Sequence, residues 1–142
     1  MKENKEIPSN EIEKGVGISF LDHSHIKADE LKFYASQSKG TMTIETEEFA
    51  AVNPQTANPE SITLKIWYQL KGKTLVKESL FEYLKSFRNV GMNQDEITLT
   101  IYEDVKKTIG HNQVTVTTFI QGNGGLGITC TESSSKGLTA GY

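Results

Sequence analysis

The chain has 142 residues, of which 36% are hydrophobic and 23% are charged, a composition typical of a globular domain with one core. Its formal net charge is -3, and Arg88 is the only arginine among its 15 basic residues. Because arginine is the preferred side chain for phosphates and guanine edges, this balance disfavours a nucleic-acid partner. No apolar run approaches the roughly 20 residues that span a bilayer, so we expect no membrane partner.

The N-terminal residues 1–14 are charged and lack the apolar region of a secretory signal. We therefore expect a polar arm at 1–14 and a cytoplasmic location. Cys130 is the only cysteine, so the chain can form no internal disulfide, and a thiolate zinc site loses support.

The first predicted strands lie between residues 16 and 46. Residues 16–20 alternate apolar and small side chains, which indicates a strand. Residues 26–36 are compatible with a strand or a short helix, and the alternation of Leu31, Phe33 and Ala35 favours a strand. Met42 and Ile44 then face one side of the next predicted strand.

A loop and a further strand follow. Asn53-Pro54 and Asn58-Pro59 predict a loop, because a residue before proline is driven out of the helical region. Residues 61–70 alternate strictly, with Ile62, Leu64 and Ile66 on one face, and predict a strand.

The apolar period changes after residue 74. The apolar residues there are spaced as one stripe of a helix, so a helix is predicted at about 75–90; they are Val76, Leu80, Phe81, Leu84 and Phe87. Residues 96–105 contain alternating Ile97, Leu99 and Ile101, and we interpret them as a strand.

Two more strands are predicted at 112–121 and 126–132. The resulting fold class is α+β, mainly β: an antiparallel sheet, sandwich or open barrel of about 6–7 strands with one helix packed on it. We expect a single domain at 15–132 and a flexible or partner-bound tail at 133–142.

The segment from Gly122 to Gly127 has the spacing G-x-G-x-x-G of a dinucleotide-binding turn. That function requires a helix directly after the motif and an acidic residue about 20 positions later. The following residues alternate like a strand, and the chain ends too early for the acidic residue. The motif therefore predicts a glycine-rich hairpin tip between the last two strands.

His23, His25 and His111 are the candidate metal ligands, since zinc accepts three histidines and a water molecule. Two histidines one residue apart point to the same side of a strand, but no pattern places His111 beside them. Surface positions are therefore the favoured interpretation. Cys130 is in phase with the apolar side of its strand, which predicts a buried thiol.

Threonine pairs recur in the predicted strands, opposite the apolar residues, and predict either ordinary solvent-facing positions or one shared polar face. The pairs are Thr41/Thr43, Thr98/Thr100, Thr115/Thr117 and Thr129/Thr131. Some aromatic side chains share such polar faces, and aromatic residues are enriched at interfaces. The interface candidates are Trp67, Phe49 and Tyr102, together with the turn residues Gly122, Gly124 and Gly127.

These observations lead to the hypothesis of a non-enzymatic binding or assembly protein. It would be a homo-oligomeric structural or adaptor subunit, in one form a ring or tube, whose partners are copies of itself or another protein. No catalytic, cofactor-binding or metal residue is assigned, and no cofactor is expected. One alternative is a small-molecule-binding domain with a pocket between helix and sheet. The other is a small metal-dependent enzyme that uses His23, His25 and His111.

Overall fold

The computed structural model describes residues 20–134, so the predicted arm at 1–14 lies outside the described residues, as does most of the predicted tail. The main sheet is antiparallel, with strand order β2-β3-β5-β6. Its strands are β2 (Thr41–Asn53), β3 (Asn58–Gln69), β5 (Val114–Gln121) and β6 (Gly127–Ser133). A small second sheet pairs β1 (Phe33–Ala35) with β4 (Lys73–Leu75).

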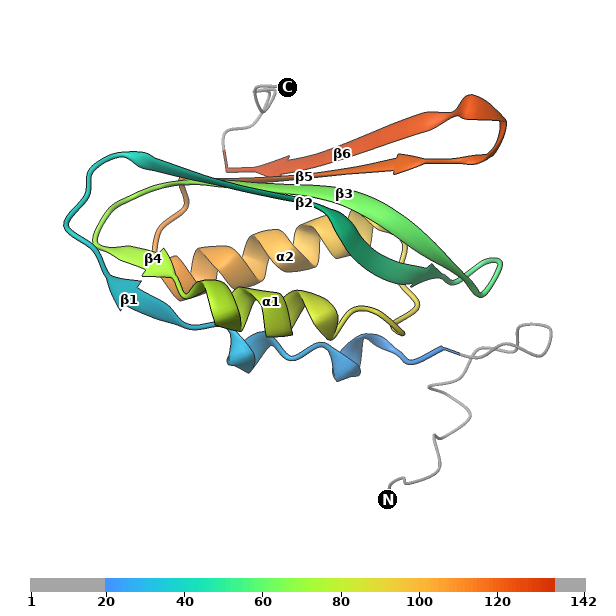
Figure 1. Cartoon of the computed structure of the whole chain (residues 1–142), viewed down its shortest axis with the longest axis horizontal. Coiled ribbons are helices and arrows are strands. Elements are labelled where there is room, and N and C mark those ends of the chain that lie inside the picture. The colour runs from blue at the N-terminus through green and yellow to red at the C-terminus, as the bar shows by residue number, and fades with distance from the viewer. Residues whose placement is uncertain (1–19, 135–142) are drawn as a thin grey trace, which may run out of the picture.

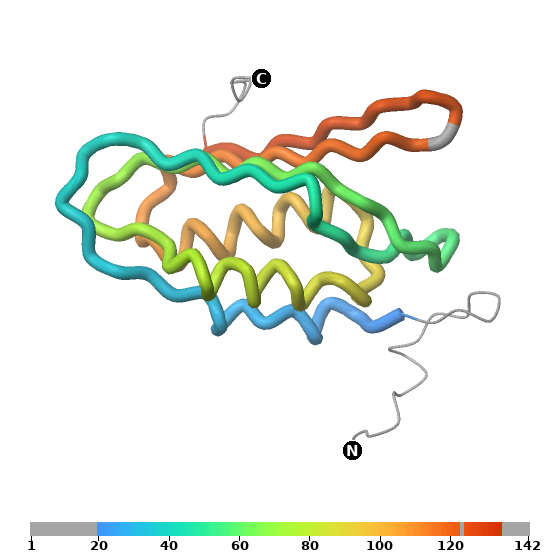
Figure 2. Tube along the Cα trace, in the orientation of Figure 1, coloured from blue at the N-terminus to red at the C-terminus, as the bar shows by residue number. Residues whose placement is uncertain are grey.

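Two α-helices, α1 (Lys77–Lys85) and α2 (Gln94–Ile109), cover one face of the main sheet (Figure 1). The N-terminal segment runs along the far side of α1 through two short 3-10 turns, η1 (His23–His25) and η2 (Ala28–Glu30) (Figures 1 and 2). A third turn, η3 (Asn123–Gly125), lies between β5 and β6. The predicted fold class, α+β and mostly antiparallel, is confirmed.

The core lies between the sheet and the helices. Alternate residues of β3, including Ile66 and Tyr68, are fully buried on the helix side. Helix α1 contributes Leu80 and Tyr83, and Phe87 follows it. Burial of these large side chains supplies most of the driving force for the fold, at about 25 cal/mol per Å² of apolar surface.

Helix α2 corrects the prediction of a strand at 96–105. Ile97, Ile101 and Val105 are spaced four residues apart and are all buried, so the same residues that alternate locally also form a helical stripe. A capping box of Asn93 and Glu96 begins the helix, and Gly110 ends it in the left-handed region at φ 80°. The predicted helix at about 75–90 is α1, and it is shorter than predicted.

Within residues 26–36, Ala28–Glu30 form the 3-10 turn η2, and only Phe33–Ala35 is the strand that the alternation favoured. In β2, the register shifts between Thr46 and Phe49. A shift of this kind turns later side chains to the other face, so Phe49 lies in the core at 4% exposure rather than on a polar face. Its ring meets that of Phe87 edge-on at 5.2 Å.

The glycine-rich segment is the hairpin tip that its sequence predicts. Strands β5 and β6 pair directly across it, and the Gly122 amide donates to the Leu126 carbonyl at 2.6 Å. Gly124 and Gly125 have φ values of 70° and 77°, where residues with a Cβ are disfavoured. Gly127 begins a strand and not a helix.

The sheet face opposite the helices is polar. Trp67 lies there between Thr43 and Thr115 in the strand register, and Thr117 lies opposite Thr131 with their hydroxyls 3.3 Å apart. The threonines of the three strand pairs therefore do share one face, as one of the two interpretations predicts. Thr98 and Thr100 are the exception, because they belong to α2.

No helix within residues 20–134 has both the length and the apolar character that crossing a membrane would require.

Candidate functional site

Three distant segments of backbone meet at one end of the molecule. The Leu21 amide donates to the Asn89 carbonyl, and the Gly91 amide donates to the Leu21 carbonyl, both at 2.8 Å. On the other side of residues 89–92, the Val52 amide donates to the Val90 carbonyl at 2.9 Å. The Met92 amide in turn donates to the Val52 carbonyl at 3.1 Å. We call this arrangement of residues 20–22, 89–92 and the end of β2 the clamp.

Phe20 seats the N-terminal segment in the clamp. Its ring lies so close to Gly91 that a Cβ at residue 91 would stand 2.0 Å from the ring carbons. The ring also packs with Val52 and Ala57, and all three side chains are buried. Glycine is therefore required at residue 91, and the position of residues 20–22 is set by packing as well as by hydrogen bonds.

A pocket of about 580 Å³ opens beside the clamp. Its walls come from the N-terminal segment, the β2–β3 turn and the first turns of α2. We call it the polar pocket, and it is lined by Phe20, Asp22, His23, Pro54, Gln55, Gly91, Met92, Asn93, Glu96, Leu99 and Thr100.

The capping box of α2 forms one wall of the polar pocket. A side-chain oxygen of Glu96 accepts from the Asn93 amide at 3.2 Å, and Glu96 itself is exposed. Its second oxygen makes no hydrogen bond among the described residues, so this carboxylate can accept another N–H group.

Asp22 and the β2–β3 turn are held by local hydrogen bonds. Asp22 Oδ1 accepts from the Ser24 amide at 3.0 Å and from its hydroxyl at 2.5 Å. Partial burial acts to raise the pKa of Asp22, but these two hydrogen bonds outweigh it and lower the pKa.

Across the pocket, Asn53 Oδ1 accepts from the Gln55 amide at 2.8 Å, and Asn53 Nδ2 donates to Glu60 at 3.1 Å. These bonds fix the turn that brings Pro54 and Gln55 to the polar pocket.

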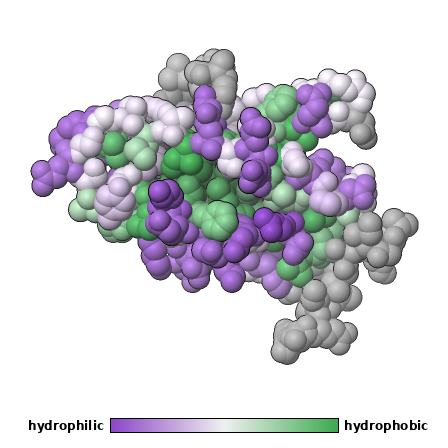
Figure 3. All heavy atoms as spheres, in the orientation of Figure 1, coloured by the Kyte–Doolittle hydropathy of each residue, from purple (hydrophilic) through white to green (hydrophobic). Residues whose placement is uncertain are grey.

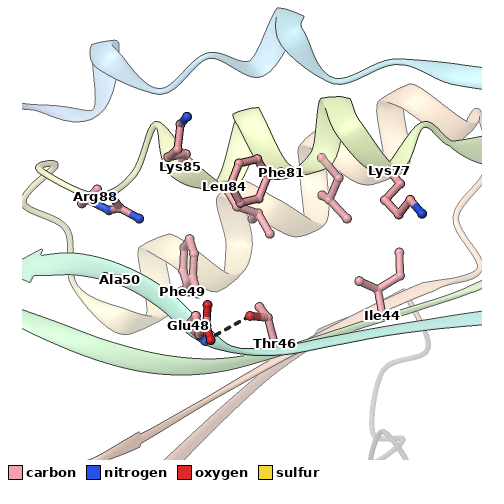
Figure 4. A pocket seen from close by; sticks show the side chains of 11 residues that line it. Ile44, Thr46, Glu48, Phe49, Ala50, Lys77, Phe81, Leu84, Lys85 and Arg88 are labelled. Atoms are coloured by element: carbon pink, nitrogen blue, oxygen red, sulfur yellow. Dashed lines mark hydrogen bonds between the residues drawn. The ribbon is translucent and has the colours of Figure 1, made fainter.

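A second cavity, of about 310 Å³, lies between α1 and β2 (Figure 4). We call it the cationic groove. Its apolar surface comes from both elements, and hydrophobic side chains are visible between the two layers with hydrophilic ones on either side (Figure 3). The groove is lined by Ile44, Thr46, Glu48, Phe49, Ala50, Lys77, Leu80, Phe81, Leu84, Lys85 and Arg88.

The charges of the cationic groove are mostly positive. Lys77 lies toward one end of α1, and Lys85 and Arg88 lie toward the other, against the single carboxylate of Glu48 (Figure 4). Phe81 is 62% exposed, and the Lys85 ammonium lies 5.2 Å from the centre of its ring. An exposed ring beside cations suits a ligand with a flat ring system and a phosphate group.

The structure does not bring the three predicted histidines together. His23 lines the polar pocket, whereas His111 follows α2 and hydrogen-bonds the Gln69 carbonyl at 2.9 Å. Within residues 20–134, no three or more His, Cys, Asp or Glu side chains are grouped so as to hold a metal ion. The metal-dependent alternative was wrong because His23 lies beside the start of α2, whereas His111 lies just after its end.

The other predicted residues lie outside both cavities, apart from Phe49, which forms part of the groove floor. Tyr102 is buried at 6% exposure in α2, and Trp67 lies half-buried on the open sheet face. Gly122, Gly124 and Gly127 belong to the β5–β6 hairpin. Cys130 is partly exposed on β6 and not buried as predicted, because β6 is an edge strand.

Sequence reasoning missed Asn93, Glu96, Lys85 and Arg88 as site residues. The spacing Asn-x-x-Glu at 93–96 is the signal that could have revealed the start of α2 and, with it, the polar pocket.

Comparison with known proteins assigns the chain to an enzyme family. The model of the family described as QueF-like protein matches residues 59–138. The chain is 36% identical over 124 residues to the NADPH-dependent 7-cyano-7-deazaguanine reductase of Thermotoga maritima, covering 86% of this chain and 90% of the relative. The reductase of the same name from Frankia casuarinae is 27% identical over 115 residues, covering 80% and 92%.

A solved structure shares the fold. The crystal structure of the archaeosine synthase QueF-Like in the apo form aligns with a TM-score of 0.64 over 69% of this chain and 96% of that chain, at 20% identity. At this identity the likeness concerns the fold alone.

These relatives correct the functional hypothesis drawn from the sequence. A non-enzymatic structural or adaptor subunit was the wrong conclusion, since the relatives that cover most of the chain are named as reductases. The error arose because open sheet edges and polar faces were interpreted as signs of assembly only. The match to the family model and the coverage of the reductases together show that the chain belongs to the QueF-like protein family.

Proposed function

We propose that this chain catalyses the NADPH-dependent reduction of a nitrile group on a 7-deazaguanine base. The observation that carries the proposal is the 36% identity to a reductase of that name over 86% of the chain and 90% of the relative. Both cavities supply side chains that suit the two reactants.

The polar pocket suits the base. A guanine-like edge presents adjacent N–H donors and a carbonyl acceptor. The carboxylate of Glu96 can accept from such donors, and the amide of Gln55 can donate and accept. Phe20, Met92 and Leu99 supply apolar surface for the ring system. Pockets of this kind, with few polar groups among apolar ones, are typical ligand sites.

The cationic groove suits the cofactor. The residues that would hold NADPH are Lys77, Lys85 and Arg88 for its phosphates and Phe81 for one of its ring systems. When bound, NADPH supplies the hydride. Arg88 of the groove and Gly91 of the polar pocket belong to one short loop, so the two cavities are neighbours along the chain.

The proposal is tested by incubating the purified protein with 7-cyano-7-deazaguanine and NADPH. We expect loss of NADPH absorbance and a product heavier than the base by four hydrogens. The nitrile is reduced to an aminomethyl group, with two hydrides and two protons added per molecule. A rate no greater than that without protein, with unchanged base by mass spectrometry, would overturn the proposal.

The groove assignment is tested with the double variant Lys85→Ala/Arg88→Ala. We expect its KM for NADPH to rise about tenfold or more with little change in kcat, since a hydrogen bond to a charged group contributes about 1.5–3 kcal/mol. The matched control is Lys106→Ala/Lys107→Ala, which removes the same net charge from α2 outside the groove. An equal rise of KM for NADPH in both double variants would show a general charge effect. It would contradict the assignment of the cationic groove as the NADPH site.

The same enzyme is also proposed to self-associate. Strands β2 and β6 are the two edges of the main sheet, and Trp67 and Phe119 interrupt its otherwise polar open face. Edge β2 of one copy can pair with edge β6 of the next, which removes the exposed edges. Use of NADPH as reductant supports a cytoplasmic location.

A further inference from the structure

A further cavity, of about 510 Å³, lies beside the last turns of α2, whereas the first turns of that helix line the polar pocket. We call it the third cavity. Its walls come from α2, from the N-terminal segment around η2, and from Phe33 of β1 and Lys73 of β4. It shares no lining residue with the polar pocket or the cationic groove, so the proposed reductase reaction does not account for it.

The charges that line the third cavity balance. They are the carboxylates of Asp29 and Asp104 and the ammonium groups of Lys73 and Lys107. None of the four is ion-paired with another residue among those that the structure describes. A ligand that carries one positive and one negative group suits such a lining better than a phosphate does, because two carboxylates would repel a phosphate.

The ion pairs of α2 show that this arrangement is specific to the cavity. Glu103 and Lys106, one position earlier on the helix and outside the cavity, lie 3.3 Å apart and form a salt bridge. Asp104 and Lys107 have the same spacing in the sequence and line the cavity without pairing. Both charged groups are therefore available to a ligand.

Asp104 is oriented before any ligand arrives. Its Oδ2 accepts from the buried Tyr83 hydroxyl at 2.5 Å, and its backbone carbonyl accepts from the Thr108 hydroxyl at 2.8 Å. Its Oδ1 makes no hydrogen bond with a described residue. Burial raises the pKa of Asp104, although the Tyr83 hydrogen bond and the charge of Lys107 oppose the shift. A cationic group at Oδ1 would offset this cost of burying the carboxylate.

The wall opposite α2 is held in place by α1. The Lys32 amide donates to Ser79 Oγ at 2.9 Å, and the Val76 amide donates to the Lys32 carbonyl at 2.9 Å. These bonds fix the segment that carries Leu31 and Phe33 into the cavity wall. The cavity is thus formed by ordered backbone on both sides.

The apolar part of the third cavity suits a flat or branched side chain. Ile26 and Leu31 line it beside the ring of Phe33, which is 46% exposed. The Lys73 ammonium lies 4.3 Å from the centre of that ring, so one positive charge borders the apolar surface. Apolar walls with a few oriented polar groups are typical of sites for small molecules.

From this arrangement we infer that the third cavity binds a free amino acid with an apolar or aromatic side chain. Side chains three positions apart on a helix are neighbours, with Cβ atoms about 5–6 Å apart. The ammonium and carboxylate of an amino acid share one carbon, so they can contact Asp104 and Lys107 together. The side chain then lies against Ile26, Leu31 and Phe33. This inference does not depend on the proposed function.

The first test measures binding of L-phenylalanine to the full chain by isothermal titration calorimetry. The comparison ligands are N-acetyl-L-phenylalanine, which lacks the ammonium, and L-phenylalaninamide, which lacks the carboxylate. We expect each to bind about tenfold or more weakly, because each loses a hydrogen bond between charged groups. Equal affinity for either analogue, or no binding of phenylalanine at millimolar concentration, would overturn the inference.

The second test places the ligand in the third cavity. Asp104→Asn keeps an oxygen for Tyr83 but removes the charge, and Lys107→Gln removes the other charge. We expect the dissociation constant of phenylalanine to rise about tenfold or more in each. The matched controls are Glu103→Gln and Lys106→Gln, which change the same charges one position away, outside the cavity.

The controls should bind phenylalanine within about twofold of the wild type, and circular dichroism verifies that all four variants are folded. Equal weakening in variants and controls would show a general charge effect and reject the site. Guanosine monophosphate that binds more tightly than phenylalanine, and loses affinity in Lys107→Gln, would assign the cavity to a nucleotide and also overturn the inference.

Discussion

At the scale of single residues, the most heavily perturbed pair is Tyr83 and Asp104. The Tyr83 hydroxyl donates to Asp104 Oδ2 at 2.5 Å, joining α1 to α2. Burial raises the pKa of Tyr83, and the neighbouring Asp104 raises it further, so the phenol remains a donor. Burial also raises the pKa of Asp104, although the hydrogen bond from Tyr83 opposes the shift.

The raised pKa of Asp104 predicts how stability changes with pH. A carboxyl group whose pKa is higher in the folded state favours folding at low pH, and this contribution is lost as the pH rises through the folded pKa. We expect Asp104→Asn to be more stable than the wild type at neutral pH, because the amide oxygen still accepts from Tyr83 and carries no charge. The advantage should shrink as the pH falls into the acid range.

Urea unfolding at neutral and acid pH measures this difference. Asp29→Asn is the control, because Asp29 is an exposed carboxylate that lines, together with Asp104, the third cavity near the end of α2. The interpretation of Asp104 fails if the difference between Asp104→Asn and the wild type is the same at both pH values.

Single residues also show where sequence reasoning reaches its limit. The alternation in β3 correctly separates buried Ile66 from half-buried Trp67, because a strand without a bulge keeps its period. Phe49 could not be placed in the same way, since a register shift precedes it. His23 and Glu96 line the same pocket although they are 73 residues apart (96 − 23), and no local signal in the sequence predicts this.

At the scale of elements, α2 is the most informative. Its first turns line the polar pocket, and many of its side chains are buried in the core. Its Asp104 also accepts the hydrogen bond from Tyr83 of α1. Its first residue also anchors the last hairpin, because the side-chain Nε2 of Gln94 donates to the Thr118 hydroxyl at 3.1 Å and to the Ile128 carbonyl at 3.0 Å. Strand β6 is therefore held by the helix as well as by β5.

The capping box should contribute measurably to the stability of α2. We expect Asn93→Ala to lower the free energy of unfolding by about 1 kcal/mol, the usual cost of losing an N-cap side chain. Urea titration followed by circular dichroism is the measurement.

The control for the capping box is Asn112→Ala, which removes the same side chain from an exposed loop position and should change stability by less than about 0.5 kcal/mol. Equal losses in the two variants would contradict a specific role for Asn93.

Element types follow from sequence only when one period dominates. The residues of α1 match the helical period and no other, and α1 was correctly predicted. In α2, Ile97, Leu99 and Ile101 match the strand period, while Ile97, Ile101 and Val105 match the helical one. Its β-branched residues favour a strand by propensity, and tertiary packing on the sheet decides for the helix.

At the scale of the whole molecule, the sheet is covered on one face and open on the other (Figure 1). Its edge strands β2 and β6 have no strand partner on their outer sides among residues 20–134, except where the clamp meets β2 at Val52. This asymmetry motivates the proposed self-association.

A charged residue at an edge opposes strand pairing between molecules. We expect the wild-type protein to elute as an oligomer and Ile128→Lys to shift toward the mass of one chain, measured by size-exclusion chromatography with light scattering. Ile128 is 45% exposed on β6. Phe81→Ser is the control, since Phe81 is more exposed but belongs to α1 on the helix layer. Wild-type protein that is monomeric at high concentration would refute self-association through these edges.

The overall architecture was accessible from sequence, because hairpins with short connections force an antiparallel sheet. The proposed reductase activity was not, because neither cavity contains a contiguous motif. The polar pocket draws on three separate segments, and the cationic groove takes its cations from α1 and the residues just after it, and its far wall from β2.

We expect the clamp to form late in folding. The hairpins β2–β3 and β5–β6 close over short turns, whereas the clamp joins residues near 21, 52 and 90, and such distant contacts form only after most of the chain is ordered. In the folded chain, we expect the few backbone hydrogen bonds of the clamp, at one end of the molecule, to open more easily than those in the buried centre of the sheet. A ligand held between the N-terminal segment and α2 would close them, so that completing the fold and binding the ligand become a single equilibrium.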